Sequence, residues 1–272
     1  MKVRELSNDL IDTRAVGTQM GIDLEEERMD DFPIYDAFAE VYDEFMDDVP
    51  YEQWCDRIDQ LLKQFAPKVA DTQELESERR LVVDLGCGTG TLSMLLAQKG
   101  YDMIGVDQSP QMLQLAMQKA MSVYESTLAE EGMDATASHI SGSAPLFLLQ
   151  DMRELDLYST VGAVISVCDS FNYLLTREDL LTVFSRVNNF LYPGGLFLFD
   201  FNTPFKYETI LGDVTIAENR DTCSFIWENE YDPETGINEY DLTLFIEEAD
   251  GRYRRFTERH YQRGYTPQEI QA

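Results

Sequence analysis

The chain has 272 residues, 44% of them hydrophobic, so it can build a sizeable core and general disorder is not expected. Lysine and arginine number 21 against 51 aspartate and glutamate, and the resulting charge of −30 argues against nucleic acid and anionic membranes as partners. The four cysteines have neither disulfide nor metal-site spacing, and no apolar run approaches a membrane span, so we predict a soluble, cytoplasmic protein without a metal.

The first 80 residues divide into three stretches. Residues 1–31 mix charges and end in the acid-rich "DLEEERMDD", which predicts a mobile acidic leader. From Phe32 to Phe65 large apolar residues recur at helical spacing, which predicts two amphipathic helices. The residues at this spacing are Tyr35, Phe38, Tyr42 and Phe45, then Trp54, Ile58, Leu61, Leu62 and Phe65. The polar residues 66–80 then form a linker.

The next stretch, up to Asn202, alternates short apolar runs with helical patterns. The runs are "LVVDLG", "YDMIGVD", "LFLLQD", "GAVISVCDS" and "GGLFLFDFN". This alternation predicts an α/β fold with a doubly wound, Rossmann-like parallel sheet, so residues 32–202 are expected to form one core domain with its N-terminal helices.

Helix boundaries within this core have clear signals. Ser109 and Pro110 suit the cap and first position of a long helix with one apolar face. That face comprises Met112, Leu113, Ala116, Met117, Ala120, Met121, Tyr124 and Leu128. Thr176 and Asp179 form an approximate capping box for another helix. The triplet Pro193-Gly194-Gly195 is expected to turn the chain into the fifth strand.

Residues 203–264 change character. Three β-rich segments are joined by the turn signals "PETG" and "DG", which predicts an antiparallel meander that serves as a cap or an interface. Thr266, Pro267 and Glu269 then mark the start of a helix in residues 265–272.

The glycine-rich segment after the first strand indicates a ligand site. Gly86, Gly88 and Gly90 allow positive φ angles and remove side chains, so the backbone can approach a bound group at the carboxyl edge of the sheet. Two ligand classes fit: a dinucleotide, or an adenosyl amino acid whose carboxylate meets the following helix. The dinucleotide fingerprint requires a third glycine at position 91, where this chain has Thr91. Asp107, at the end of the second strand, suits ribose hydroxyls in either class.

These residues resemble the class I S-adenosylmethionine-dependent methyltransferases. The resemblance covers about residues 35–267 and rests on five motifs in the family's order, "VVDLGCGTG", "GVDQSPQML", "LLQDMREL", "SVCDSFNYL" and "PGGLFLFDFNTP". The segments "YDAFAEVYDEFMDDVPYEQW" and "ERHYQRGYTPQEI" also look like a bacterial subgroup that acts on small molecules.

The resemblance implies a set of cofactor contacts. Those for the methionine end of the cofactor are Asp84, Gly86, Cys87 and Gly88, with Gly90 in the same loop. Those for the adenosine end are Asp107 and Gln108 at the ribose, and Asp151 and Met152 at the adenine. Cys168 and Asp169 should face the reacting methyl group, and Tyr35 and Tyr42 resemble aromatic residues that close over the cofactor, although both also suit a plain helix core.

The implied reaction is methyl transfer from S-adenosylmethionine to a small-molecule acceptor by in-line displacement, for which alignment and exclusion of water suffice. A general base is needed only for a protonated acceptor, and Asp169 or His260 could serve; Tyr42 completes the candidate catalytic residues. The alternatives are a catalytically silent binder of the same cofactor and an NAD(P)-dependent oxidoreductase, which Thr91 disfavours.

The resemblance also has one departure. The family normally continues after residue 267 with a helix and two more strands beside the fifth strand, so we expect the usual C-terminal helix and last two strands to be missing. The fifth strand would then be an exposed edge, which predicts self-association into a homodimer.

Overall fold

The computed structural model describes residues 35–65, 80–131 and 144–272. The predicted leader and residues 66–79 of the predicted linker therefore lie outside the described residues. The chain forms two compact units. The α/β unit comprises Ala39–Phe171 and Thr176–Asp200, and the sheet unit comprises residues 35–38, 172–175 and 201–272 of the described part. None of the described helices is long and apolar enough to cross a membrane.

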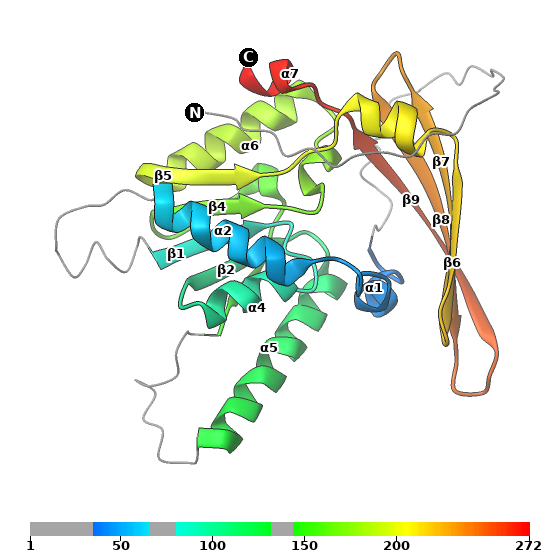
Figure 1. Ribbon diagram of the computed structural model, residues 1–272, viewed down its shortest axis with the longest axis horizontal. Helices are drawn as coiled ribbons and strands as arrows, with labels where there is room; N and C mark the ends of the chain where they lie inside the picture. The colour runs from blue at the N-terminus through cyan, green and yellow to red at the C-terminus, as the bar shows by residue number, and fades with distance from the viewer. Residues whose placement is uncertain (1–34, 66–79, 132–143) are drawn as a thin grey trace. The chain divides into compact units, whose positions relative to one another are not determined.

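The α/β unit contains a parallel sheet of five strands in the order β3-β2-β1-β4-β5 (Figure 1). The strands are β1 (Leu81–Leu85), β2 (Asp102–Asp107), β3 (Leu146–Leu149), β4 (Val161–Ser166) and β5 (Leu191–Phe199). All six residues of β4 are buried, as expected for the centre of a sheet that is covered on both faces. The predicted Rossmann-like fold is confirmed.

Two helices precede β1, and helices or 3-10 turns follow the first four strands. They are α1 (Ala39–Phe45), α2 (Tyr51–Phe65), α4 (Thr91–Gln98), α5 (Pro110–Glu131) and α6 (Arg177–Phe190), with the 3-10 turns η1 (Met152–Glu154) and η2 (Ser170–Tyr173). Both predicted caps are confirmed, because Ser109 Oγ accepts from the Met112 N–H at 3.1 Å and Thr176 Oγ1 accepts from the Asp179 N–H at 3.1 Å.

Part of the predicted apolar face of α5 is buried. Met112, Leu113 and Ala116 are buried, whereas Met117 is 45% and Met121 63% exposed. Met121 lies in the second half of α5, which extends beyond the sheet in Figure 1 and has no strand to pack against.

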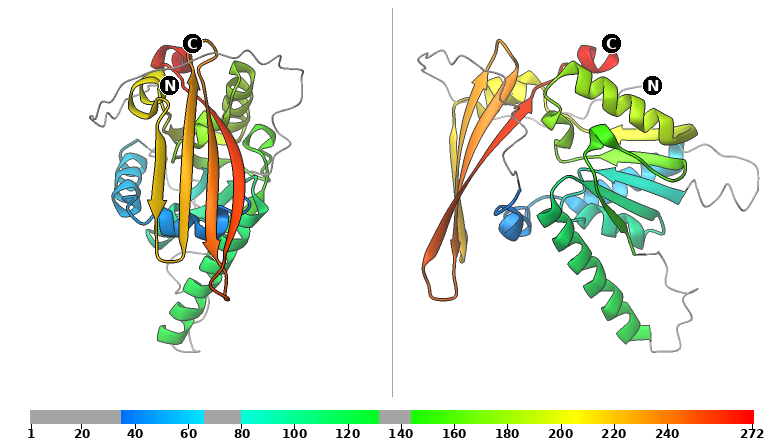
Figure 2. Two further views of the ribbon diagram at one scale, coloured as in Figure 1. Left: turned by 90° about the vertical axis from the view of Figure 1, so that its right-hand side faces the viewer. Right: turned by 180° about the vertical axis from the view of Figure 1, so that it is seen from behind.

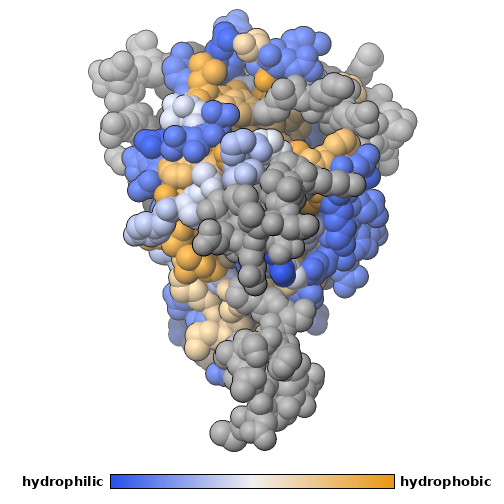
Figure 3. All heavy atoms as spheres, turned by 90° about the vertical axis from the view of Figure 1, so that its left-hand side faces the viewer, coloured by the Kyte–Doolittle hydropathy of each residue, from blue (hydrophilic) through white to orange (hydrophobic). Residues whose placement is uncertain are grey.

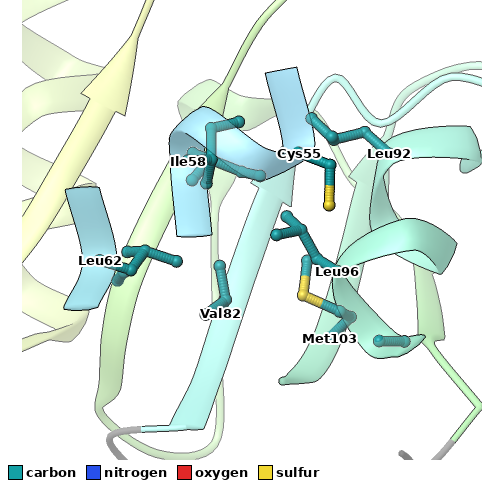
Figure 4. Packing of buried hydrophobic residues seen from close by; sticks show 10 residues of the cluster. Cys55, Ile58, Leu62, Val82, Leu92, Leu96 and Met103 are labelled. Atoms are coloured by element: carbon teal, nitrogen blue, oxygen red, sulfur yellow. The ribbon is translucent and has the colours of Figure 1, made fainter. Parts of the chain in front are cut away.

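The core beside β1 is formed mainly by α2 and α4. Figure 4 shows Ile58 of α2 above Val82 of β1 and Leu62 to its left, with Leu92 and Leu96 of α4 on the right. Burying each of these side chains contributes about 1.5–3 kcal/mol relative to exposure. This packing fixes the position of β1 and of the loop that follows it.

The Pro193-Gly194-Gly195 segment differs from the prediction. It lies inside β5 as a bulge rather than before the strand, because Val161 pairs with Leu191 and Ala163 with Leu196. Gly194 has a φ of +85°. β5 is one of the two edge strands of this sheet, and none of its residues is fully buried. Hydrophobic residues reach the surface among hydrophilic ones on the face in Figure 3.

The sheet unit contains the predicted meander as a four-stranded antiparallel sheet, β6-β7-β8-β9 (Figure 2). Its strands are β6 (Thr215–Asn219), β7 (Cys223–Asp232), β8 (Ile237–Glu247) and β9 (Tyr253–Arg263). The turn signals are confirmed: Gly236 and Gly251, between successive strands, have φ angles of +74° and +78°. β6 was not predicted. A π-helix, η3 (Lys206–Leu211), precedes it, and α7 (Pro267–Gln271) carries the predicted capping box.

The first N-terminal helix begins later than its apolar spacing predicts. Tyr35 and Phe38 precede α1, and Tyr35 has a φ of +57°. The backbone N–H groups of both residues donate to the carboxylate of Glu258 on β9, at 2.8 and 2.9 Å. A right-handed helix requires negative φ angles, so α1 cannot include Tyr35.

Candidate functional site

The glycine loop follows β1, and its three predicted glycines serve different purposes. Gly86, Gly88 and Gly90 all have positive φ angles, of 72°, 54° and 74°. A Cβ on Gly86 would lie 2.5 Å from Ser170 Oγ, and one on Gly90 would lie 2.9 Å from the Phe147 ring, whereas one on Gly88 would meet nothing within 4 Å. Only Gly88 therefore faces open space that a ligand could fill.

Asp107 fixes the shape of this loop from the end of β2. One carboxylate oxygen accepts from the Gly88 N–H at 2.8 Å, and the other accepts from the Ser109 N–H at 2.9 Å. Burial raises the pKa of Asp107, although these two hydrogen bonds oppose the rise. The residue thus joins the glycine loop to the start of α5.

Asp84, near the end of β1, is a second buried acid. Ser93 donates to its carboxylate at 2.6 Å. Burial raises the pKa of Asp84 to about 6, although the hydrogen bond from Ser93 lowers it. Cys87 lies beside these acids, and burial together with the charges of Asp84 and Asp107 raises the pKa of its thiol well above the usual value. Cys87 is therefore a neutral thiol that packs in the loop, where its Sγ would lie 2.8 Å from a Cβ on Gly105.

A depression of about 300 Å³ lies at the carboxyl ends of β2 and β3. Its lining residues are Gln108, Leu149, Gln150, Asp151 and Glu154. Two of the predicted adenosine contacts, Gln108 and Asp151, are thus brought together. Met152 is close to the glycine loop, since its Cε would be 3.9 Å from a Cβ on Gly86.

Asp151 has a partner that sequence reasoning missed. Its carboxylate accepts from the guanidinium of Arg153, at 3.0 Å from Nε and 2.6 Å from Nη2, and also accepts from the Arg153 N–H. Arg153 in turn lies 3.6 Å from Asp179 at the start of α6. Asp151 therefore caps η1 and is held in place by an arginine two residues away.

Cys168 and Asp169 form the turn that follows β4, one residue after the strand ends. The hydroxyl of Tyr51, at the start of α2, hydrogen-bonds to Cys168 and to Tyr42 of α1. Burial, with the charges of Asp169 and Asp200, raises the pKa of the Cys168 thiol, and burial raises the pKa of Tyr51. Tyr42 and Cys168 are thus brought together, and Tyr51 joins them; the segment that contains Tyr51 was part of the resemblance, but no role followed from it for this residue.

A further missed contact ties α1 to the glycine loop. Asp43, the residue after Tyr42, accepts from Thr89 Oγ1 at 2.6 Å and forms an ion pair with Lys119 at 2.6 Å. Lys119 also donates to Thr91 Oγ1 at 3.1 Å. The only sequence signal for this contact is the acidic residue next to Tyr42. A single sequence does not distinguish that residue from a solvent-exposed acid on a helix.

The remaining two candidates, Tyr35 and His260, belong to the sheet unit. The hydroxyl of Tyr173 lies 2.8 Å from that of Tyr35 and 3.0 Å from Nδ1 of His260. Nε2 of His260 lies 3.3 Å from the carboxylate of Glu258, and the His260 side chain is only 1% exposed. Because both ring nitrogens face protein groups, a structural role for His260 is favoured over contact with a substrate.

The α/β unit therefore gathers twelve of the fourteen predicted residues at the carboxyl ends of its strands and in the helices beside them. They are Tyr42, Asp84, Gly86, Cys87, Gly88, Gly90, Asp107, Gln108, Asp151, Met152, Cys168 and Asp169. Two buried acids, an open backbone position and a polar depression suit a ligand with a cationic group, vicinal hydroxyls and a base.

Comparisons with known proteins agree on one family. The family model described as "Methyltransferase domain" matches residues 82–195. The putative methyltransferase YqeM of Bacillus subtilis (strain 168) is 34% identical over 240 residues, which cover 88% of this chain and 83% of that protein. A putative methyltransferase of Geobacillus sp. (strain WCH70) is 33% identical over 85% of this chain and 83% of its own length.

The solved structures lead to the same family. An S-adenosylmethionine-dependent methyltransferase from Clostridium acetobutylicum ATCC 824 superposes with a TM-score of 0.64. It is 27% identical, and the match covers 87% of this chain and 84% of that one.

Proposed function

This chain is a class I S-adenosylmethionine-dependent methyltransferase, and from that premise we propose that it methylates a small molecule that is neutral or cationic, such as an amine. The choice of a neutral or cationic acceptor rests on the net charge of −30, because a negatively charged protein repels anions at long range and attracts cations. Membership of the methyltransferase family argues against the alternative of an NAD(P)-dependent oxidoreductase. A silent binder of the same cofactor is the remaining alternative, and turnover distinguishes it.

The residues of the α/β unit fit this cofactor. The space beside Gly88 would admit the methionine end of the cofactor, and the carboxylate of Asp84 would attract its ammonium group. Asp107 would accept hydrogen bonds from the ribose hydroxyls. The depression at Gln108 and Asp151 would take the adenine.

When bound, the cofactor supplies a methyl group activated by a positively charged sulfur. The chain itself mainly has to align the acceptor and exclude water. Tyr42 and Tyr51 lie beside Cys168, and their rings suit a cationic sulfur. Cys168 has a raised pKa, so it stays a neutral thiol and does not compete with the acceptor as a nucleophile. Asp169 would take the proton from an acceptor that arrives protonated.

The experiment that tests this function is isothermal titration with S-adenosylhomocysteine, with NADH as a control. We expect binding of the thioether alone, followed by its production from S-adenosylmethionine in a screen of amine, hydroxyl and carbon acceptors. Binding of NADH instead would contradict the assignment. Binding without turnover of any acceptor would favour the silent binder.

The pKa of Asp84 predicts how cofactor binding depends on pH. Because this pKa is raised to about 6, Asp84 is ionised above pH 6 and neutral below it, and its burial as an anion at neutral pH costs stability rather than adding to it. An ammonium group binds only the ionised form well. Affinity for S-adenosylhomocysteine should therefore fall about tenfold from pH 7 to pH 5, measured by titration calorimetry.

The control for this prediction is Asp84→Asn, which cannot ionise. Its affinity should be weaker at pH 7 and nearly flat down to pH 5. Circular dichroism at each pH verifies that both proteins stay folded. If Asp84→Asn keeps the pH dependence of the original chain, another group is responsible, and Asp107, whose pKa is also raised, would be the one to substitute next.

A further inference from the structure

The turn at the end of β4 has an unusual backbone. Cys168 and Asp169 are consecutive, neither is glycine, and their φ angles are +61° and +52°. Side chains disfavour this left-handed region, so such a pair persists only where the surroundings hold it in place. The family resemblance implies that these two residues face the reacting methyl group, so what holds them also affects the site.

Asp200 contacts both residues. One of its carboxylate oxygens accepts from the Cys168 N–H at 3.1 Å, and the other accepts from the Asp169 N–H at 3.0 Å. Hydrogen bonds to a carboxylate are stronger than those between neutral groups. Asp200 is itself well placed for this, because it directly follows β5 and its own N–H donates to the carbonyl of Ser166 in β4 at 3.1 Å. The two carboxylate bonds therefore fix the turn relative to the neighbouring strand.

The turn also contacts the glycine loop. Ser170, the next residue, donates through Oγ to the carbonyl of Val167 at 3.0 Å and lies 3.4 Å from the carbonyl of Gly86. Gly86 has no side chain, and a Cβ there would come within 2.7 Å of Ser170 Cβ. The position of the turn thus determines how closely Ser170 packs against Gly86.

We propose that Asp200 is a positioning residue of the cofactor site: it holds the Cys168–Asp169 turn in its left-handed conformation and so keeps Ser170 against Gly86. The inference rests on the proposed function, since the ligand of this site is taken to be S-adenosylmethionine. Asp200 acts through the backbone of the turn and does not itself contact the cofactor. Its motif, "PGGLFLFDFNTP", contributed to the family resemblance, but no role followed from it for this residue.

The first test needs no ligand. Amide hydrogen exchange of Cys168 and Asp169 is measured by NMR in the full chain and in Asp200→Ala. Because the carboxylate accepts both N–H groups, we expect both amides to exchange at least tenfold faster in the variant. The exposed Asp213→Ala removes the same charge and should leave both rates unchanged. Equal rates in the original chain and Asp200→Ala would overturn the proposal.

The second test links the turn to the cofactor. Asp200→Ala should weaken binding of S-adenosylhomocysteine by about 5–20-fold, measured by titration calorimetry, while Asp200→Asn, whose amide oxygen can still accept one N–H, should lose less. Adding Asp169→Gly to Asp200→Ala should restore affinity to within about threefold, because glycine adopts a positive φ without strain. If Asp200→Ala weakened binding only because a charge is lost, adding Asp169→Gly would not restore the affinity.

The two tests fail differently. If the original chain does not bind S-adenosylhomocysteine but its turn amides are protected by Asp200, the proposed function fails and the carboxylate contact stands. If the ligand binds equally well to the original chain and to Asp200→Ala, or if the glycine variant does not recover the loss, the positioning role of Asp200 is overturned.

Discussion

Asp107→Ala should weaken binding of S-adenosylhomocysteine by at least about a hundredfold. The carboxylate would bind the ribose hydroxyls, and in the structure it also accepts from the N–H groups of Gly88 and Ser109. Hydrogen bonds to a charged group contribute about 1.5–3 kcal/mol each, so losing even two of them exceeds the roughly 2.7 kcal/mol of a hundredfold change. The measurement is titration calorimetry at pH 7.5.

The matched control is Asp102→Ala, at the opposite end of the same strand. It removes an acid of equal charge without changing the carboxyl edge of the sheet, so its affinity should stay within about twofold. The thermal midpoint of each variant shows whether the fold is kept. Unchanged affinity in Asp107→Ala would contradict the assignment of this residue to the ribose.

Gly86→Ala should destabilise the chain by about 2–4 kcal/mol and abolish measurable cofactor binding. A Cβ at this position would lie 2.5 Å from Ser170 Oγ and 2.7 Å from Ser170 Cβ. The residue must also keep a φ of +72°, which an alanine adopts only with strain. Overpacking and backbone strain each cost about 1–3 kcal/mol. Thermal and urea unfolding measure the loss of stability.

Gly88→Ala is the control for this clash. Its φ of +54° is also left-handed, but its Cβ would meet nothing within 4 Å, so only the strain of about 1 kcal/mol is expected. The second variant is Ser170→Gly in the Gly86→Ala background, which removes the atoms in the way and should recover part of the stability. Equal stability of Gly86→Ala and Gly88→Ala would show that the loop relaxes around the added methyl group.

The sequence by itself determined the framework of the α/β unit. The spacing of apolar residues predicted all five parallel strands, and Ser109 and Thr176 marked where α5 and α6 begin. The glycine loop and Asp107 indicated the ligand site. These features could be predicted because their causes are local: alternation, cap geometry and φ angles act within a few residues of the chain.

The tertiary structure decided which residues surround that site. Asp200 contacts a turn about 30 residues before it, Tyr51 joins Tyr42 to Cys168, and Asp43 contacts Thr89. No local pattern distinguishes these residues from ordinary surface or core positions. Their partners are chosen by the register and packing of strands and helices that lie far apart in the chain.

The same reason explains where the structure differs from the predictions or adds to them. The Pro193-Gly194-Gly195 bulge depends on how β5 pairs with β4, and the exposure of Met121 depends on where the sheet ends beneath α5. The purpose of each loop glycine depends on its neighbours, which are Ser170 at Gly86 and open space at Gly88. The sequence determines which local backbone conformations are favoured and which side chains are present. Contacts between distant segments form only once the chain has folded.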